Sequence, residues 1–94
     1  MTVHSKTKTS FYRRLYVAFL IDSGVATVPA IIDVTGMPRR TAQDTVAALE
    51  ELHISCQFVG AKKSGGYQIS NWGPINPDWL KANIEMIQLT LGYR

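Results

Sequence analysis

The chain has 94 residues, which suffices for one domain of ordinary size but not for a second domain with its own core, and this length excludes most enzyme architectures. Hydrophobic residues make up 46% of the chain and charged residues 18%, a balance that predicts a folded globular protein. Ten Lys and Arg against seven Asp and Glu give a net charge of +3, so the distribution of the positive charges decides whether a polyanionic partner is expected.

The cysteine content and the lengths of the apolar runs indicate the cellular compartment in which the protein is expected. A single cysteine, Cys56, excludes an internal disulfide and fits a reducing compartment. The longest uninterrupted apolar run, residues 15–21, falls far short of the roughly 20 residues that a membrane span needs. No small-residue cleavage site follows the cationic N-terminus, as a signal peptide would require. We therefore expect a cytoplasmic protein without a membrane partner.

The first part of the chain predicts a polar arm followed by a helix. Residues 1–8 are polar and cationic without periodicity, which is typical of a flexible arm. A helix is then expected from a cap at Thr9 or Ser10 to about Asp22. Apolar side chains surround most of this helix, so it must be covered on two sides. They are Phe11, Leu15, Tyr16, Val17, Ala18, Phe19, Leu20 and Ile21.

Two more helices separated by a tight turn are expected next. Residues 25–27 predict a very short strand, after which Thr27 caps a helix with Pro29 near its start. Gly36 suits the left-handed position after that helix, and Pro38 is placed in the first turn of the next one. The third helix, expected over residues 38–52, has an inward apolar stripe and an opposite polar face. The stripe consists of Ala42, Val46, Leu49 and Leu52, and the opposite face of Arg40, Gln43, Asp44, Ala47 and Glu51.

From residue 54 the hydrophobic period changes to two, which predicts a β-hairpin. The loop of this hairpin, residues 60–66, presents Lys62 and Lys63 between glycines. A last helix is expected from a cap at Asn76 to about Leu91. Its apolar stripe consists of Leu80, Ile84, Ile87 and Leu91, widened by Trp79, Met86 and Leu89.

This order of elements resembles the winged helix-turn-helix family of DNA-binding domains. Residues 35–43 (TGMPRRTAQ) look like the turn and the start of the recognition helix, with Gly36 in the turn and Met37 as an apolar plug. Residues 49–54 (LEELHI) look like the passage into the first wing strand, although the family often has Gly where this chain has His53. The likeness covers roughly residues 9–72 and is greatest to short bacterial stand-alone members without a sensor domain.

The resemblance implies an α+β, mainly α fold with a three-helix core, a β-hairpin wing and an additional C-terminal helix. The expected organisation is an arm over residues 1–8, a winged domain over 9–75 and an additional helix over 76–94 that packs on the first helix. The implied function is sequence-specific binding of double-stranded DNA by a small transcriptional regulator. Its recognition helix, residues 38–52, enters the major groove and its wing loop, residues 60–66, lies on the backbone.

Eight of the ten basic residues lie in three places: near the N-terminus, at the start of the third helix and in the wing loop. An Arg fork matches guanine, Gln pairs with adenine, and Asp44 accepts from a cytosine amine or pairs with Arg40 one turn away. Arg13 and Arg14 are expected to pair with acids or to edge a subunit interface. The candidate DNA contacts are Arg39, Arg40, Thr41, Gln43, Asp44, Lys62 and Lys63, with Lys6 and Lys8 as candidate backbone contacts.

Two broadly apolar helices exceed what a core of about 60 residues covers, so we expect a two-fold homodimer through the first and last helices. The alternative for this surface is intramolecular, with the last helix packing on the first and completing the core of one chain. An alternative function is a protein-interaction module that docks a partner through the same two helices. The expected dimer contacts are Leu20, Trp79, Leu80, Ile84, Ile87 and Leu91.

No catalytic site, metal site, cofactor or small-molecule ligand is expected. His4 and His53 have no metal-ligand spacing to other candidate ligands. Cys56 alternates with residues of the inward face, which favours a buried structural thiol over a nucleophile. The Gly65-Gly66 pair is not followed by a helix and so does not form a phosphate-cradling loop.

Overall fold

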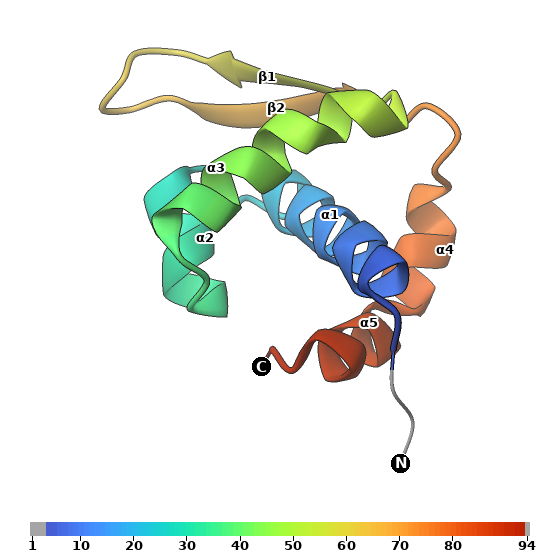
Figure 1. Ribbon diagram of the computed structural model, residues 1–94. Coiled ribbons are helices and arrows are strands. Elements are labelled where there is room, and N and C mark those ends of the chain that lie inside the picture. The colour runs from blue at the N-terminus through green and yellow to red at the C-terminus, as the bar shows by residue number, and fades with distance from the viewer. Residues whose placement is uncertain (1–3, 94) are drawn as a thin grey trace.

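The computed structural model describes residues 4–93, which form helices and one β-hairpin (Figure 1). This composition confirms the predicted α+β, mainly α fold class with a hairpin wing. The elements in chain order are α1 (Lys6–Asp22), α2 (Val28–Thr35), α3 (Arg39–Ala48), the 3-10 helix η1 (Leu49–Leu52), β1 (Ser55–Val59), β2 (Gly66–Asn71), α4 (Pro77–Ala82) and α5 (Ile84–Leu91).

Helix α1 begins earlier than the sequence predicts. Ser5 is its N-cap, and the Ser5 hydroxyl accepts a hydrogen bond from the Lys8 amide at 3.0 Å. Because this cap satisfies an amide of the first turn, residues 6–8 are helical. The predicted arm is therefore wrong for residues 6–8, while residues 1–3 lie outside the described part of the chain. The predicted end of the helix at Asp22 is confirmed.

Residues 25–27, between α1 and α2, do not form the predicted short strand. A single bond joins it to the hairpin, in which the Tyr67 amide donates to the Ala26 carbonyl at 2.7 Å. The predicted start of α2 is confirmed, since the Thr27 hydroxyl accepts from the Ala30 amide at 3.2 Å and Pro29 lies in the first turn. These contacts place the start of α2 beside β2.

Helix α3 differs from its prediction at both ends. Pro38 precedes the helix as its N-cap instead of lying in its first turn, and the α-helix ends at Ala48. The chain continues as η1 and then turns at His53, whose φ of 62° is the left-handed conformation in which the family often has glycine. Among the described residues, His53 is the one non-glycine residue with a positive φ.

The two strands pair in antiparallel orientation, with an irregularity between Ser55 and Cys56. Phe58 lies opposite Tyr67, and the two rings meet edge to face with centroids 5.2 Å apart. Cys56 pairs with Ile69, and both side chains pack against the core. The predicted hairpin is therefore present. The contact between Phe58 and Tyr67 extends its side-chain packing toward the loop.

The predicted last helix is broken into α4 and α5 at Asn83. Asn76 caps the start as expected, accepting from the Asp78 and Trp79 amides. Asn83 has a φ of −114° and a ψ of 12°, and its side-chain amide donates to the Trp79 carbonyl at 2.8 Å. This side chain hydrogen-bonds to a backbone carbonyl at the point where the helix would continue. Such a bond favours a bend over a straight helix.

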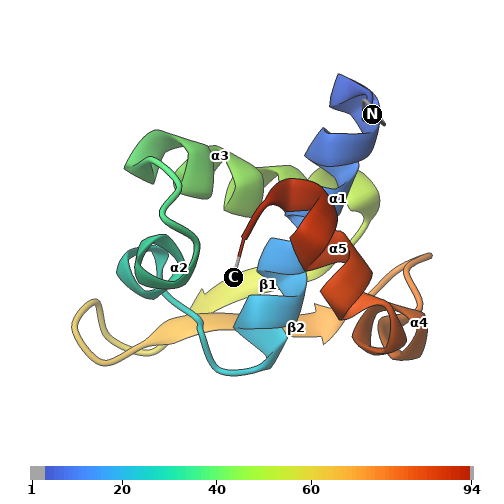
Figure 2. The same cartoon turned by 90° about the horizontal axis from the view of Figure 1, so that it is seen from below.

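The core lies on two sides of α1, as its apolar surface predicts. Val17, Ala18 and Ile21 face the helix-turn-helix and the hairpin, in a cluster with Ile31, Met37, Ala42, Val46, Leu49 and Ile54. Figure 2 shows α5 lying across α1, with α4 on one side of α1 and α2 and α3 on the other side. On the α4–α5 side the buried residues are Leu15, Tyr16, Leu20, Leu80 and Ile87.

The structure corrects most of the expected dimer contacts. Leu20, Leu80 and Ile87 are buried in the chain's own core, and Ile84 and Leu91 are half-buried against the same cluster. The apolar stripe of α4 and α5 covers α1. This packing is the intramolecular alternative that the sequence left open. Of the expected contacts, Trp79 alone is well exposed, at 47%.

We expect Leu80→Ala to lower the free energy of unfolding by about 2–5 kcal/mol, because it removes a fully buried side chain and leaves a cavity. The matched control is Val34→Ala on α2, which should stay within about 0.5 kcal/mol because Val34 is exposed and lies away from α4 and α5. Urea unfolding followed by circular dichroism measures both. Equal values for the two variants would contradict the packing of α4 and α5 on α1.

Candidate nucleic-acid interface

The turn between α2 and α3 fixes the direction of α3. Gly36 has a φ of 73°, and its amide donates to the Ile32 carbonyl at 2.7 Å. The Thr35 hydroxyl donates to the Ile31 carbonyl at 2.8 Å and accepts from the Met37 amide at 3.2 Å. Met37 is buried in the core cluster, as expected of the apolar plug. The hydrogen bonds of this turn and the burial of Met37 hold α3 with one face toward α1 and one face toward solvent.

The outer face of α3 presents long polar side chains. Arg39, Arg40, Gln43 and Asp44 are all exposed, as predicted. The Arg40 Nε lies 3.8 Å from Asp44 Oδ2, which confirms the expected pair one helical turn apart. The two side chains are 92% and 75% exposed, so this pair adds little stability and leaves the Arg40 guanidinium open to another partner.

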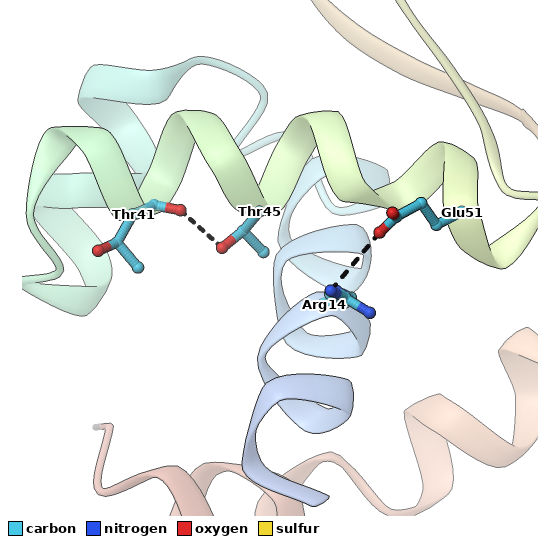
Figure 3. A network of polar contacts seen from close by, with 4 residues as sticks. All are labelled: Arg14, Thr41, Thr45 and Glu51. Carbon is cyan, nitrogen blue, oxygen red and sulfur yellow. Dashed lines mark hydrogen bonds and ion pairs between the residues drawn. The ribbon is translucent and has the colours of Figure 1, made fainter. Parts of the chain in front are cut away.

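Thr41 lies on a different side of α3 from Arg40 and Gln43, and it lines a cavity together with Asp44. Thr41 is half-buried, and its carbonyl accepts a hydrogen bond from the buried Thr45 hydroxyl at 2.6 Å. Figure 3 shows both threonines on the edge of α3 that faces α1. The structure therefore does not bring Thr41 together with Arg40 and Gln43.

The wing loop holds its two lysines in solvent. The Ala61 carbonyl accepts from the Ser64 and Gly65 amides at 3.2 and 2.6 Å, which closes the loop tightly. A Cβ at Gly65 would clash with the Val59 carbonyl, so this close approach requires glycine. Lys62 and Lys63 are exposed. Figures 1 and 2 both place the loop and the N-terminal end of α3 at the same end of the molecule.

The N-terminal lysines lie elsewhere. Lys6 and Lys8 are exposed on the first turns of α1, and the Lys8 Nζ lies 5.6 Å from the centroid of the Tyr12 ring. Both figures place this end of α1 away from the wing loop. The candidate backbone contacts Lys6 and Lys8 are therefore not gathered with Lys62 and Lys63.

A polar cavity that the sequence does not predict lies between α1 and α3. The cavity has a volume of about 230 Å³ and is lined by Ser10, Arg13, Arg14, Thr41, Asp44, Thr45 and Ala48. Arg14 Nη2 lies 3.6 Å from Glu51 Oε2, which confirms the expectation that this arginine pairs with an acid (Figure 3). No spacing within α1 signals the cavity, because it arises only where α1 packs beside α3.

Burial affects the chemistry of the Cys56 thiol. Cys56 is half-buried, and this burial raises the pKa of its thiol, which keeps the thiol protonated at neutral pH. Across residues 4–93, no three His, Cys, Asp or Glu side chains are grouped in a way that would hold a metal ion. The helices in that range include none that is long and apolar enough to cross a membrane.

Comparison with known proteins agrees with this geometry. Residues 6–91 match the winged helix-turn-helix family, so the match takes in α4 and α5 as well as the expected core. A crystal structure of a DUF2131 family protein from Shewanella amazonensis SB2B is similar over 97% of this chain and 91% of that chain, with a TM-score of 0.89 and 34% sequence identity. No curated protein sequence matches the chain significantly. The chain thus belongs to the winged helix-turn-helix family, whose fold is a DNA-binding fold.

Proposed function

We propose that this chain is a small transcriptional regulator of the cytoplasm that binds double-stranded DNA at specific sequences. In this proposal α3 enters the major groove and the wing loop, residues 60–66, lies against the backbone. The observation that carries the proposal is the exposed polar face of α3, a helix whose N-terminal end lies at the same end of the molecule as the wing loop (Figure 1). A buried plug and a bonded turn hold this face in place, so the side chains that read bases stand on a rigid support.

The exposed side chains of α3 match the edges of bases. Arg39 and Arg40 carry planar forks of donors that fit the O6 and N7 acceptors of guanine, and Gln43 offers the donor and acceptor pair that fits adenine. Asp44 pairs with Arg40 in the protein alone. On DNA, Asp44 would accept from a cytosine amine or hold Arg40 in a fixed direction, and either role favours some sequences over others.

Two further features favour contact with phosphates. Lys62 and Lys63 end in flexible ammonium groups at an exposed tip, which suits phosphate contact better than base recognition. The N-cap of α3 is Pro38, which makes no side-chain hydrogen bond to the helix amides. The first amides of α3 therefore keep their capacity to bind an anion, aided by the helix dipole.

We also propose a homodimer, on a narrower apolar surface than the sequence indicated. Three apolar side chains on α4 and α5 stay exposed after α1 is covered: Trp79, Met86 and Leu89. A two-fold dimer through this surface would match the two half-sites, about 34–36 Å apart, that paired recognition helices read. The alternative function, a module that docks another protein through α1 and α4–α5, would use the same surface. One stoichiometric protein partner together with no salt-sensitive duplex binding would favour that alternative.

We expect Arg39→Ala and Arg40→Ala each to weaken binding to a selected duplex by about 1–3 kcal/mol, roughly 5- to 150-fold, because each removes a fork aimed at a base edge. Lys81→Ala removes the same charge from α4 and serves as the matched control, with a change of less than about twofold. Fluorescence anisotropy over a salt series measures all three. Binding that is absent in the native chain, or equal losses for the three variants, would contradict base recognition by α3.

In sedimentation equilibrium at tens of micromolar, an order of magnitude at which stable dimers persist, we expect a two-chain mass. Leu89→Glu should give a single-chain mass, because a charge placed in an apolar interface costs more than the contact contributes. Val34→Glu on α2 alters another exposed apolar side chain and should leave the dimer intact. A single-chain mass for the native protein would refute the dimer without touching the DNA proposal.

A further inference from the structure

Two arginines of α1 lie beside the recognition helix, on the side away from the wing. Thr41, Thr45 and Ala48 share the edge of α3 that faces α1, and they line the 230 Å³ cavity together with Ser10, Arg13 and Arg14. The hairpin approaches from a different side, where Glu50 lines another cavity with residues 53–57. Figure 1 shows the same arrangement, with the hairpin above α3 and α1 below it. The recognition helix is thus flanked by the hairpin on one side and by the α1 cavity on the other.

The donors in this cavity are only partly used by the protein. Arg14 pairs with Glu51, and Asp44 pairs with Arg40. The Arg13 Nε is buried and has no hydrogen-bond partner among the described residues. Because this Nε is closed to solvent, the terminal nitrogens of the Arg13 guanidinium are the donors that a ligand in the cavity could reach.

The chemistry of the lining selects an oxyanion. The guanidinium of Arg13 offers a planar fork, and the hydroxyls of Ser10 and Thr41 add neutral donors. Asp44 is the one acid among the lining residues, and its carboxylate is offset by Arg40. A volume of about 230 Å³ holds a phosphate group with several waters, each of which takes about 30 Å³ in the liquid.

The dimensions of DNA bring a phosphate to this place. The major groove is about 12 Å wide, and a helix with its side chains is about 10–12 Å across, so the backbones of both strands border a helix that lies in the groove. We propose that the cavity between α1 and α3 binds a backbone phosphate of the strand opposite the wing, with Arg13 as its main ligand and Ser10 and Thr41 beside it. This assignment rests on the proposed DNA binding. It makes α1 a second phosphate-binding element and explains why Thr41 faces α1 instead of the bases.

Salt dependence of duplex binding tests the assignment directly. Each phosphate contact contributes about 0.9 to the slope of log affinity against log salt concentration, so Arg13→Ala should lower the slope by about 0.9. Its affinity should fall by the same factor for a selected and a random duplex, because a phosphate contact carries no sequence information. Arg13→Lys keeps the charge and should keep the slope. The control Lys81→Ala removes the same charge from α4 and should leave the slope unchanged.

A second variant covers the case in which Arg13→Ala fails to fold. Ser10→Asp places a carboxylate in the cavity lining without removing the arginine, and it should lower both affinity and slope because it repels phosphate. Thermal unfolding confirms that each variant is folded before its binding is measured. A slope equal to that of the native chain for both Arg13→Ala and Ser10→Asp would overturn the assignment.

Inorganic phosphate distinguishes a backbone phosphate from a free one. Backbone amide NMR shifts of residues 10–14 and 41–48 are followed while phosphate is added to the chain without DNA. Lowered slopes for the cavity variants support the backbone phosphate, whether or not these shifts occur. Phosphate-induced shifts that Arg13→Ala abolishes, combined with unchanged slopes, would overturn it and assign the cavity to a free phosphate ligand. If Arg39→Ala and Arg40→Ala weaken binding while the cavity variants match Lys81→Ala, this inference fails and the proposed function stands.

Discussion

Burial of α1 on two sides is the constraint on which the rest of the structure depends. Val17, Ala18 and Ile21 pack against the helix-turn-helix, and Leu15, Tyr16 and Leu20 pack against α4 and α5. Each fully buried side chain of this kind contributes about 1.5–3 kcal/mol. A winged domain ending at β2 would leave one of these faces in water, so α4 and α5 are part of what makes the fold stable. The Tyr16 hydroxyl, which accepts a 2.9 Å hydrogen bond from the Gln88 side chain, shows that this second side is specifically packed.

The same constraint determines which surfaces meet a partner. Because α3 uses Ala42 and Val46 to cover α1, its arginines and glutamine face outward. The bond between the Tyr67 amide and the Ala26 carbonyl ties the hairpin to the segment before α2. Arg13 and Arg14 of α1 lie beside α3 on its other flank. Six of the ten basic residues thus lie on α3 or on its two flanks: Arg13, Arg14, Arg39, Arg40, Lys62 and Lys63.

The order of the helices and strands along the chain was predictable, because residues close together in the sequence determine turns and helix caps. Thr27, Pro29 and Gly36 specify both ends of α2, and the change of hydrophobic period at residue 54 specifies the hairpin. Ser5 and Asn83 were missed because a cap outside the periodic region and a bend inside it leave the hydrophobic pattern almost unchanged. The expected dimer contacts and the α1–α3 cavity were not predicted correctly, because both depend on how the helices pack against one another. The hydrophobic period shows that one face of a helix is apolar, but it does not show which element covers that face.

Amide hydrogen exchange of the chain alone and with a saturating selected duplex tests most directly whether α3 and its two flanks are the DNA-binding surface. The account predicts slower exchange in α3, in residues 60–66 of the wing loop and in residues 10–14 of α1, with α4 and α5 unchanged relative to the protein alone. Protection confined to α4 and α5, or none in α3, would contradict it.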